Sequence, residues 1–212
     1  MATDPSPSSA APFTGDCEFI DAEIRFLKVR ASRIVAQQEH RARQQAEEGE
    51  DARPGRYSVR DLRCRAHDLE VREEELRAAI DARLAATRAD TSRPKLGLDR
   101  LCQSHRLDSQ ERMIALAVCI PAISPHLAEV TFSEIGNVFR SMSYGDIARL
   151  LDLTGSAAWV NARHYLDADS PLVAGNIVTI QPVPGPQAPD SIWYADITIT
   201  EYGFQTITGD KS

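Results

Sequence analysis

The chain has 212 residues, of which 42% are hydrophobic and 26% charged, so it is long enough to bury a core. Its formal net charge of -7 disfavours electrostatic binding to nucleic acid or to an anionic membrane surface. No apolar run approaches the roughly 20 residues of a membrane span, and residues 1–16 lack the features of a signal peptide. We therefore expect a cytoplasmic protein.

Residues 1–15 are rich in Pro, Ser and Ala and predict a disordered tail, whereas residues 16–90 predict a helical hairpin. Two apolar stripes repeat in steps of four and three, the spacing of a coiled-coil heptad, on either side of a break at Pro54 and Gly55. The stripes comprise Ile20, Ile24, Leu27, Ala31 and Ile34 in the first helix, and Leu62, Ala66, Leu69, Glu73, Leu76, Ile80 and Leu84 in the second.

A helix with one apolar stripe must bury it against a neighbour, here the other helix, a partner chain or the rest of the protein. Five stripe residues are our candidate contacts for a partner protein or for self-association: Ile24, Leu27, Leu69, Leu76 and Ile80. The alternative is that these side chains only pack the hairpin together.

Residues 91–212 predict a winged-helix domain with a small C-terminal β-wing, so the fold class is mostly α (α+β). An apolar helix starts at Asp108 or Ser109 and is expected to end at Pro121 and Pro125. Residues 126–141 fit either a helix pair or a helix with a short strand. Ser143 and Asp146 form a capping box for the next helix, and three residues after it a second helix is predicted over 156–166. Pro171 ends that helix, and segments 173–183 and 192–207 predict the strands of the wing.

No known catalytic or cofactor motif occurs in the chain. The motifs GxxxxGK[ST], GxSxG, HExxH and GxGxxG are all missing, and the four cysteines form no metal-ligand spacing. Glu73, Glu74 and Glu75 read as a solvated charge run. We therefore predict no enzyme activity, no catalytic residue, no cofactor and no metal in this chain. A site in a cleft near Trp159, Trp193 and Tyr194 is the remaining enzyme hypothesis, although these aromatics are more simply explained as core.

The predicted helix-turn-helix raises a second hypothesis, a winged-helix DNA-binding transcription regulator. Its second helix would offer Asn161, Arg163 and His164 to base edges. Charge opposes this, because residues 91–212 contain nine basic and thirteen acidic residues. The expected wing loop PGPQAPDS has no Lys or Arg to contact phosphates. A role in protein contact is therefore favoured.

A further pattern runs through the segments RLDSQERMIALAVCIPAISPHLAE, MSYGDIARLLDLTG and RHYLDADSPLVAGNIVTI, within residues 96–180. Leu107, Ser109 and Glu111 open an apolar helix, and Pro171 with Leu172 leads into a strand. This pattern resembles the N-terminal winged-helix region of large bacterial AAA+ ATPases, including those that accompany phage-tail-like contractile injection systems. In that family the helix has a Leu-Ser-x-x-Glu type start, which this chain matches only approximately.

In the family, a helical segment precedes the winged helix and a P-loop ATPase follows it. The hairpin at 16–90 agrees with the first feature, whereas no Walker motif occurs before Ser212. The resemblance implies a non-catalytic interaction and adaptor module that recruits substrate to the motor or regulates it. ATP hydrolysis would then belong to a C-terminal portion absent from this chain, and the partner would be that ATPase core or another protein.

Overall fold

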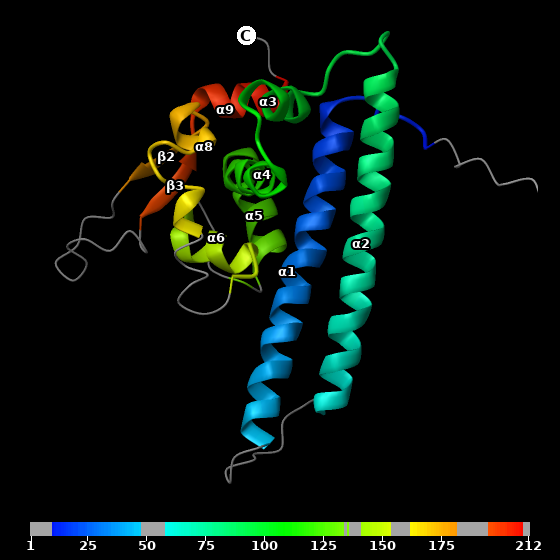
Figure 1. The fold of residues 1–212 in the computed structure, drawn as a ribbon, viewed down its shortest axis with the longest axis vertical. Helices are drawn as coiled ribbons and strands as arrows, with labels where there is room; N and C mark the ends of the chain where they lie inside the picture. Colours follow the sequence, from blue (N-terminus) through cyan, green and yellow to red (C-terminus); the bar gives the residue numbers. More distant parts are fainter. Residues whose placement is uncertain are drawn as a thin grey trace, which may run out of the picture.

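A computed structural model describes residues 10–47, 58–133, 135, 141–153, 162–181 and 195–209. Two long helices, α1 (Asp16–Glu47) and α2 (Val59–Ala89), lie side by side and form the predicted hairpin (Figure 1). Their apolar stripes face each other, and Leu27 and Ile80 are almost completely buried. None of the described helices is long and apolar enough to cross a membrane.

The remaining elements pack on one side of the upper part of the hairpin (Figure 1). In chain order they are α3 (Gly97–His105), α4 (Ser109–Ile123), α5 (Pro125–Phe132), β1 (Met142–Ser143), α6 (Tyr144–Leu150), α8 (Pro171–Ala174), β2 (Val178–Gln181), β3 (Asp196–Ile199) and α9 (Glu201–Thr208). One continuous buried cluster includes Leu27 of α1, Ile80 of α2, Leu116 of α4 and Ile147 of α6. The proposed division of the chain at residue 90 stays a prediction.

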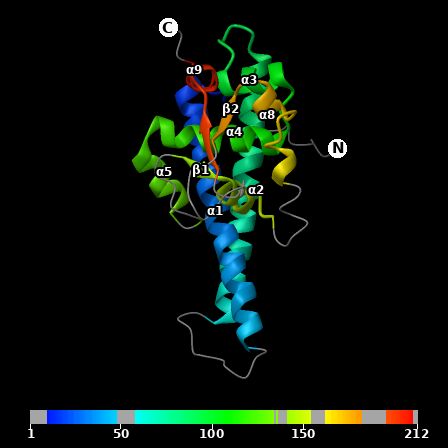
Figure 2. The ribbon, with the colours of Figure 1, turned by 90° about the vertical axis from the view of Figure 1, so that its left-hand side faces the viewer.

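The three strands form an antiparallel sheet in the order β1-β3-β2, which lies in front of the hairpin in the view of Figure 2. Met142 pairs with Ile197, and Val178 pairs with Ile199. A short strand followed by a helix, with two later strands completing the sheet, is the arrangement expected for a winged helix. The mostly helical fold with a small C-terminal β-wing is therefore confirmed.

Local capping sets several helix starts. The predicted box of Ser143 and Asp146 is present: the Asp146 N–H donates to the Ser143 hydroxyl, and the Asp146 carboxylate accepts from the Ser143 N–H. Asp108 and Glu111 form an equivalent box that starts α4. At the end of α6, Asp152 adopts a left-handed backbone with φ 57, a conformation that Asp tolerates better than most residues. Residues 154–161, which include the start of the predicted second helix, lie outside the described residues.

Two prolines, Pro121 and Pro171, act differently from the prediction, whereas α4 does end directly before Ser124 and Pro125 as expected. Pro121 lies inside α4, three residues before its C-cap Ser124, instead of ending the helix. Pro125 and Pro171 each begin a helix, α5 and α8, at a position where the missing N–H has no helical acceptor. The side chains of the preceding serines cap both helices.

The predicted second β segment is only partly a strand. β3 ends at Ile199, and residues 201–208 form α9, which was expected to be β. Thr200 caps this helix by accepting from the Gly203 N–H at 3.0 Å. Gly203 packs against the turn before β2, where a β-carbon would lie 2.6 Å from the Ile177 carbonyl oxygen. Similarly, residues 173–176 belong to α8 and a turn, so β2 is shorter than predicted.

The last residues of the predicted N-terminal tail, 10–15, are ordered against the hairpin. Phe13 is 1% exposed, and its N–H donates to the Thr87 hydroxyl of α2 at 2.8 Å. The Arg83 guanidinium lies 4.0 Å from the Phe13 ring centroid and also pairs with Glu18. The buried side chain of Phe13 therefore holds residues 10–15 against the hairpin. Residues 1–9 lie outside the described part of the chain.

Glu73 joins three helices. Its two oxygens accept from Arg30 Nη1 at 2.6 Å and Arg33 Nε at 2.5 Å, both on α1. Arg30 Nε also donates to the Leu150 carbonyl at the end of α6, and Arg33 reaches the Asp152 carboxylate at 3.1 Å. Glu73 therefore occupies a stripe position because two buried cations compensate its charge. The interpretation of Glu73 as part of a solvated charge run was wrong.

Replacing Glu73 by Gln should destabilise the protein by about 3 kcal/mol, because it removes the carboxylate that pairs with Arg30 and leaves Arg33 with Asp152 alone. Urea denaturation at neutral pH measures this. The matched control is Glu74→Gln at the neighbouring exposed position, which should change the unfolding free energy by less than about 0.5 kcal/mol. Equal effects of the two substitutions would contradict a structural role for Glu73.

The ion pair at the start of α1 gives a pH prediction. A hydrogen bond from Arg83, followed by one from the Thr14 N–H, lowers the pKa of Glu18 from 4.5 to about 2. A carboxylate with a lowered folded-state pKa stabilises the protein above its unfolded pKa and loses that effect as pH falls. The Glu18→Gln variant should therefore be less stable than the wild type at pH 7, with the difference disappearing as pH falls from 4.5 to about 2. A pH-independent difference in thermal unfolding would contradict this.

Candidate functional site

The five candidate partner contacts mostly lie inside the molecule. Ile24, Leu27 and Ile80 are 7%, 1% and 3% exposed and belong to the common core. Leu76 is half-buried and packs against the same core, while Leu69 is half-buried further down α2. In this structure the first three pack the hairpin, and their contact with a partner stays a prediction.

The structure describes only part of the candidate DNA-reading helix. Residues 162–164 are helical, and Arg163 and His164 are exposed, whereas Asn161 lies outside the described residues. Arg163 Nε lies 3.3 Å from Asp167 Oδ1, so its charge has an acidic neighbour within the same segment. Trp159, Trp193 and Tyr194 also lie outside the described residues, as does the predicted wing loop PGPQAPDS. The enzyme cleft hypothesis is therefore untested.

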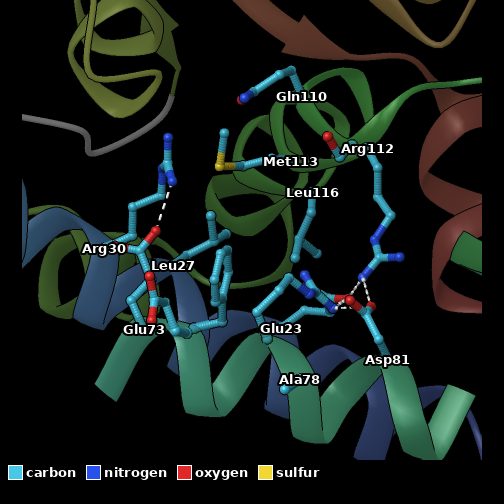
Figure 3. Close-up of a pocket in the computed structure, with 14 residues that line it drawn as sticks. Glu23, Leu27, Arg30, Glu73, Ala78, Asp81, Gln110, Arg112, Met113 and Leu116 are labelled. Atoms are coloured by element: carbon cyan, nitrogen blue, oxygen red, sulfur yellow. Dashed lines mark hydrogen bonds and ion pairs between the residues drawn. The ribbon is translucent and has the colours of Figure 1, made fainter. Parts of the chain in front are cut away.

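A hollow of about 500 Å3 lies where the hairpin meets α4, and we call it the junction groove (Figure 3). Its floor is apolar and comes from two elements. Phe26 and Leu27 project from α1, and Met113 and Leu116 project from α4. Ala78 on α2 lies at the rim and is exposed, so the groove is open at that side.

One end of the groove is closed by a cluster of charges around Glu23. This α1 carboxylate is only 3% exposed, yet it accepts two hydrogen bonds of 3.0 Å from Arg77 of α2. Arg112 of α4 donates to the same carboxylate, and Asp81 lies 3.1 Å from Arg77 Nη2 (Figure 3). The cluster holds α1, α2 and α4 together, with charges that offset one another.

The cation of Arg77 is stabilised in this setting. Burial alone would lower the pKa of Arg77, but the hydrogen bond and charge of Glu23 raise it above its ordinary value. The guanidinium also lies 4.8 Å from the centroid of the Phe26 ring, where a cation is attracted by the aromatic face. Arg77 therefore stays charged and fixes the position of the Phe26 side chain in the floor.

The opposite end of the groove is closed by Arg30 and Glu73, the pair that also reaches α6. The groove therefore lies between two charge clusters, each of which uses its own cations to neutralise its carboxylates. The exposed Glu74 and Ser109 and the half-buried Gln110 complete the rim. A rim with offset charges around an apolar floor suits an apolar side chain better than a charged ligand.

The arrangement offers no evident catalytic pair. Burial raises the pKa values of the Cys102 and Cys119 thiols to about 12, so neither forms a thiolate near neutral pH. Within the described ranges, no three His, Cys, Asp or Glu side chains are grouped as metal ligands.

Sequence reasoning missed Glu23, Arg77 and Arg112, the residues that frame the groove. One signal was available, because Glu73 interrupts an otherwise apolar stripe and a buried carboxylate requires cationic partners. That signal leads to Arg30 and Arg33 of α1, the partners of Glu73 at the other end of the groove. The Glu23 cluster depends on how Arg112 of α4 packs against the hairpin, and that packing is not encoded in helical periodicity.

Comparison with known proteins agrees with the fold. A family model described as "Winged helix domain, variant" matches residues 1–210. No curated protein and no solved structure matches the chain. The match includes the hairpin as well as the elements that carry the sheet. The chain therefore belongs to the family of variant winged-helix domains.

Proposed function

We propose that this chain is a non-catalytic interaction and adaptor module that holds a protein partner in the junction groove. The observation that carries the proposal is the groove itself, an open hollow of about 500 Å3 with an apolar floor and internally paired rim charges. Such hollows accept the large apolar side chains that dominate the energy of protein interfaces. We also propose that no catalytic step takes place in this chain.

The fixed shape of the floor supports this role. Phe26, Leu27 and Leu116 are 7%, 1% and 1% exposed, so they are held by packing before any partner arrives. Arg77 and Arg112 are held by Glu23. A partner that inserts a Leu, Phe or Trp side chain would order few additional groups, and a smaller ordering cost leaves more of the interaction energy as affinity.

The motor context rests on the resemblance to the N-terminal regions of bacterial AAA+ ATPases. The winged-helix family and the leading hairpin agree with that resemblance. We propose that the partner is the ATPase core, in the same polypeptide or a separate one, or a substrate protein of that motor in the cytoplasm. The genomic reading frame downstream of the Ser212 codon tests whether the ATPase core belongs to the same polypeptide. If it does, we expect the motif GxxxxGK[ST] in frame. A stop codon directly after Ser212 would exclude an ATPase core in the same polypeptide.

The groove gives a direct binding prediction. Peptides selected from a displayed random library against the full chain should carry a large apolar residue, and Ala78→Trp should weaken their binding at least about tenfold by filling the groove. Isothermal titration with a synthetic selected peptide measures the change. Ala79→Trp is the matched control, because Ala79 is exposed on the same helix turn but does not line the groove.

Two results would contradict this binding mode. Equal weakening by both tryptophan variants would indicate a general effect on α2. Unchanged binding in Ala78→Trp, with thermal unfolding and circular dichroism like those of the wild type, would place the peptide elsewhere.

The DNA-regulator alternative predicts a different outcome. Because the 91–212 region is acidic and Arg163 pairs with Asp167, we expect no retention of genomic DNA fragments even at about 50 mM salt. Filter binding or gel shift measures this. Retention that Arg163→Ala abolishes, with Arg100→Ala as the exposed control outside that segment, would favour the regulator and contradict the adaptor proposal.

A further inference from the structure

A second surface lies on the free end of the hairpin, which projects below the other described elements (Figures 1 and 2). Among the described residues, the ion pair nearest this end that joins the hairpin to a later element is that of Arg33 with Asp152. We call residues 36–47 of α1 and 58–72 of α2 the distal arm. This surface is separate from the junction groove, and the argument for it does not depend on what the groove binds.

The distal arm contains a hollow of about 680 Å3 between α1 and α2, which we call the basic hollow. Arg41 lines it from α1, and Arg60 and Arg63 line it from the first two turns of α2. His40 and His67 also line it, and Glu70 is the one carboxylate among its described lining residues. Since guanidinium groups stay protonated in proteins, the hollow carries an excess of positive charge at neutral pH.

Three arginines of the hollow have no carboxylate partner. Within the described part of the chain, Arg41, Arg60 and Arg63 form no ion pair, and they line one hollow, whereas Arg72 and Arg100, which also form none there, lie outside it. By contrast, Arg65 on the same turns of α2 faces Glu39 at 4.0 Å. Higher on α2, Arg77, Arg83 and Arg88 each pair with a carboxylate. The chain as a whole has a net charge of -7, so this group of cations is a local exception. Cations that line one hollow without carboxylate partners repel one another, and an external anion would relieve that repulsion.

The surroundings of the hollow restrict the kind of anion. The rim carboxylate Glu70 and the nearby exposed Asp61 and Asp68 would repel a polyanion that extends beyond the hollow. Nucleic-acid binding also relies on several consecutive phosphate contacts or on aromatic stacking, and the described residues of the lining include no Phe, Tyr or Trp. A short run of carboxylates fits both the size and the charge. Arginine binds carboxylates with paired N–H donors, which adds directionality.

We propose that the basic hollow binds a short acidic segment of a partner protein, through Arg41, Arg60 and Arg63. The adaptor would then contact its partner at two places: an apolar side chain in the junction groove and a carboxylate cluster on the distal arm. Two linked contacts raise the overall affinity without requiring either one to be strong.

The test uses the full chain and a fluorescein-labelled triglutamate peptide as the probe, and its binding is measured by fluorescence anisotropy at low salt. The wild type should bind the peptide with an affinity that falls as salt rises, and Arg60→Ala combined with Arg63→Ala should lower the affinity by about tenfold or more. The matched control combines Arg72→Ala with Arg100→Ala, which removes the same charge from exposed positions outside the hollow and should change the affinity by less than about twofold.

Three results would overturn the proposal. The first is no peptide binding to the wild type at low salt. The second is an equal loss in both double variants, since that would reflect net charge and not the hollow. The third is tighter binding of an eight-nucleotide oligo-dT, with loss in the Arg60/Arg63 variant, which would identify a nucleic acid as the ligand. Binding of the selected groove peptide is measured in parallel, so failure at the hollow is separable from failure of the groove.

Discussion

The buried carboxylate of Glu73 is the interaction on which the rest of the structure depends. It lies at a position of the α2 stripe where the repeat calls for an apolar residue, and it is compensated by Arg30 and Arg33 of α1. Both arginines continue to the end of α6, one to the Leu150 carbonyl and the other to Asp152. A single charge therefore sets the register of the hairpin and the position of the winged-helix elements against it. A buried ion pair of this kind is valuable for specificity even where its net contribution to stability is modest.

A buried carboxylate held by arginines also closes the other end of the junction groove. Glu23, almost fully buried, holds Arg77 of α2 and Arg112 of α4, so the first helix is tied to its neighbours at two levels. Between these levels lies the groove, with Phe26 and Leu116 in its apolar lining. The proposed binding role rests on that lining and on the paired charges at the two ends of the groove.

Periodicity and capping predicted much of the fold and little of the site. The alternating stripes located α1 and α2, and the Ser143–Asp146 box located α6, because these signals are local. Residues 201–208 were misassigned as strand, since their helix depends on the Thr200 cap and on close packing of Gly203, which is a tertiary contact. The groove required Arg112 to approach Glu23 across 89 positions of sequence, and helical spacing carries no information about such pairs.

The most direct test uses the methionines as reporters, because the chain has three and two of them occupy informative places. Met113 lines the groove, whereas Met142 is fully buried in β1 of the sheet. The measurement is an NMR titration of the chain, labelled with carbon-13 at the methionine methyl groups, with a selected apolar peptide. The account predicts that the Met113 signal shifts and the Met142 signal does not. A shift of Met142 with Met113 unchanged would place recognition on the winged-helix sheet and contradict the account.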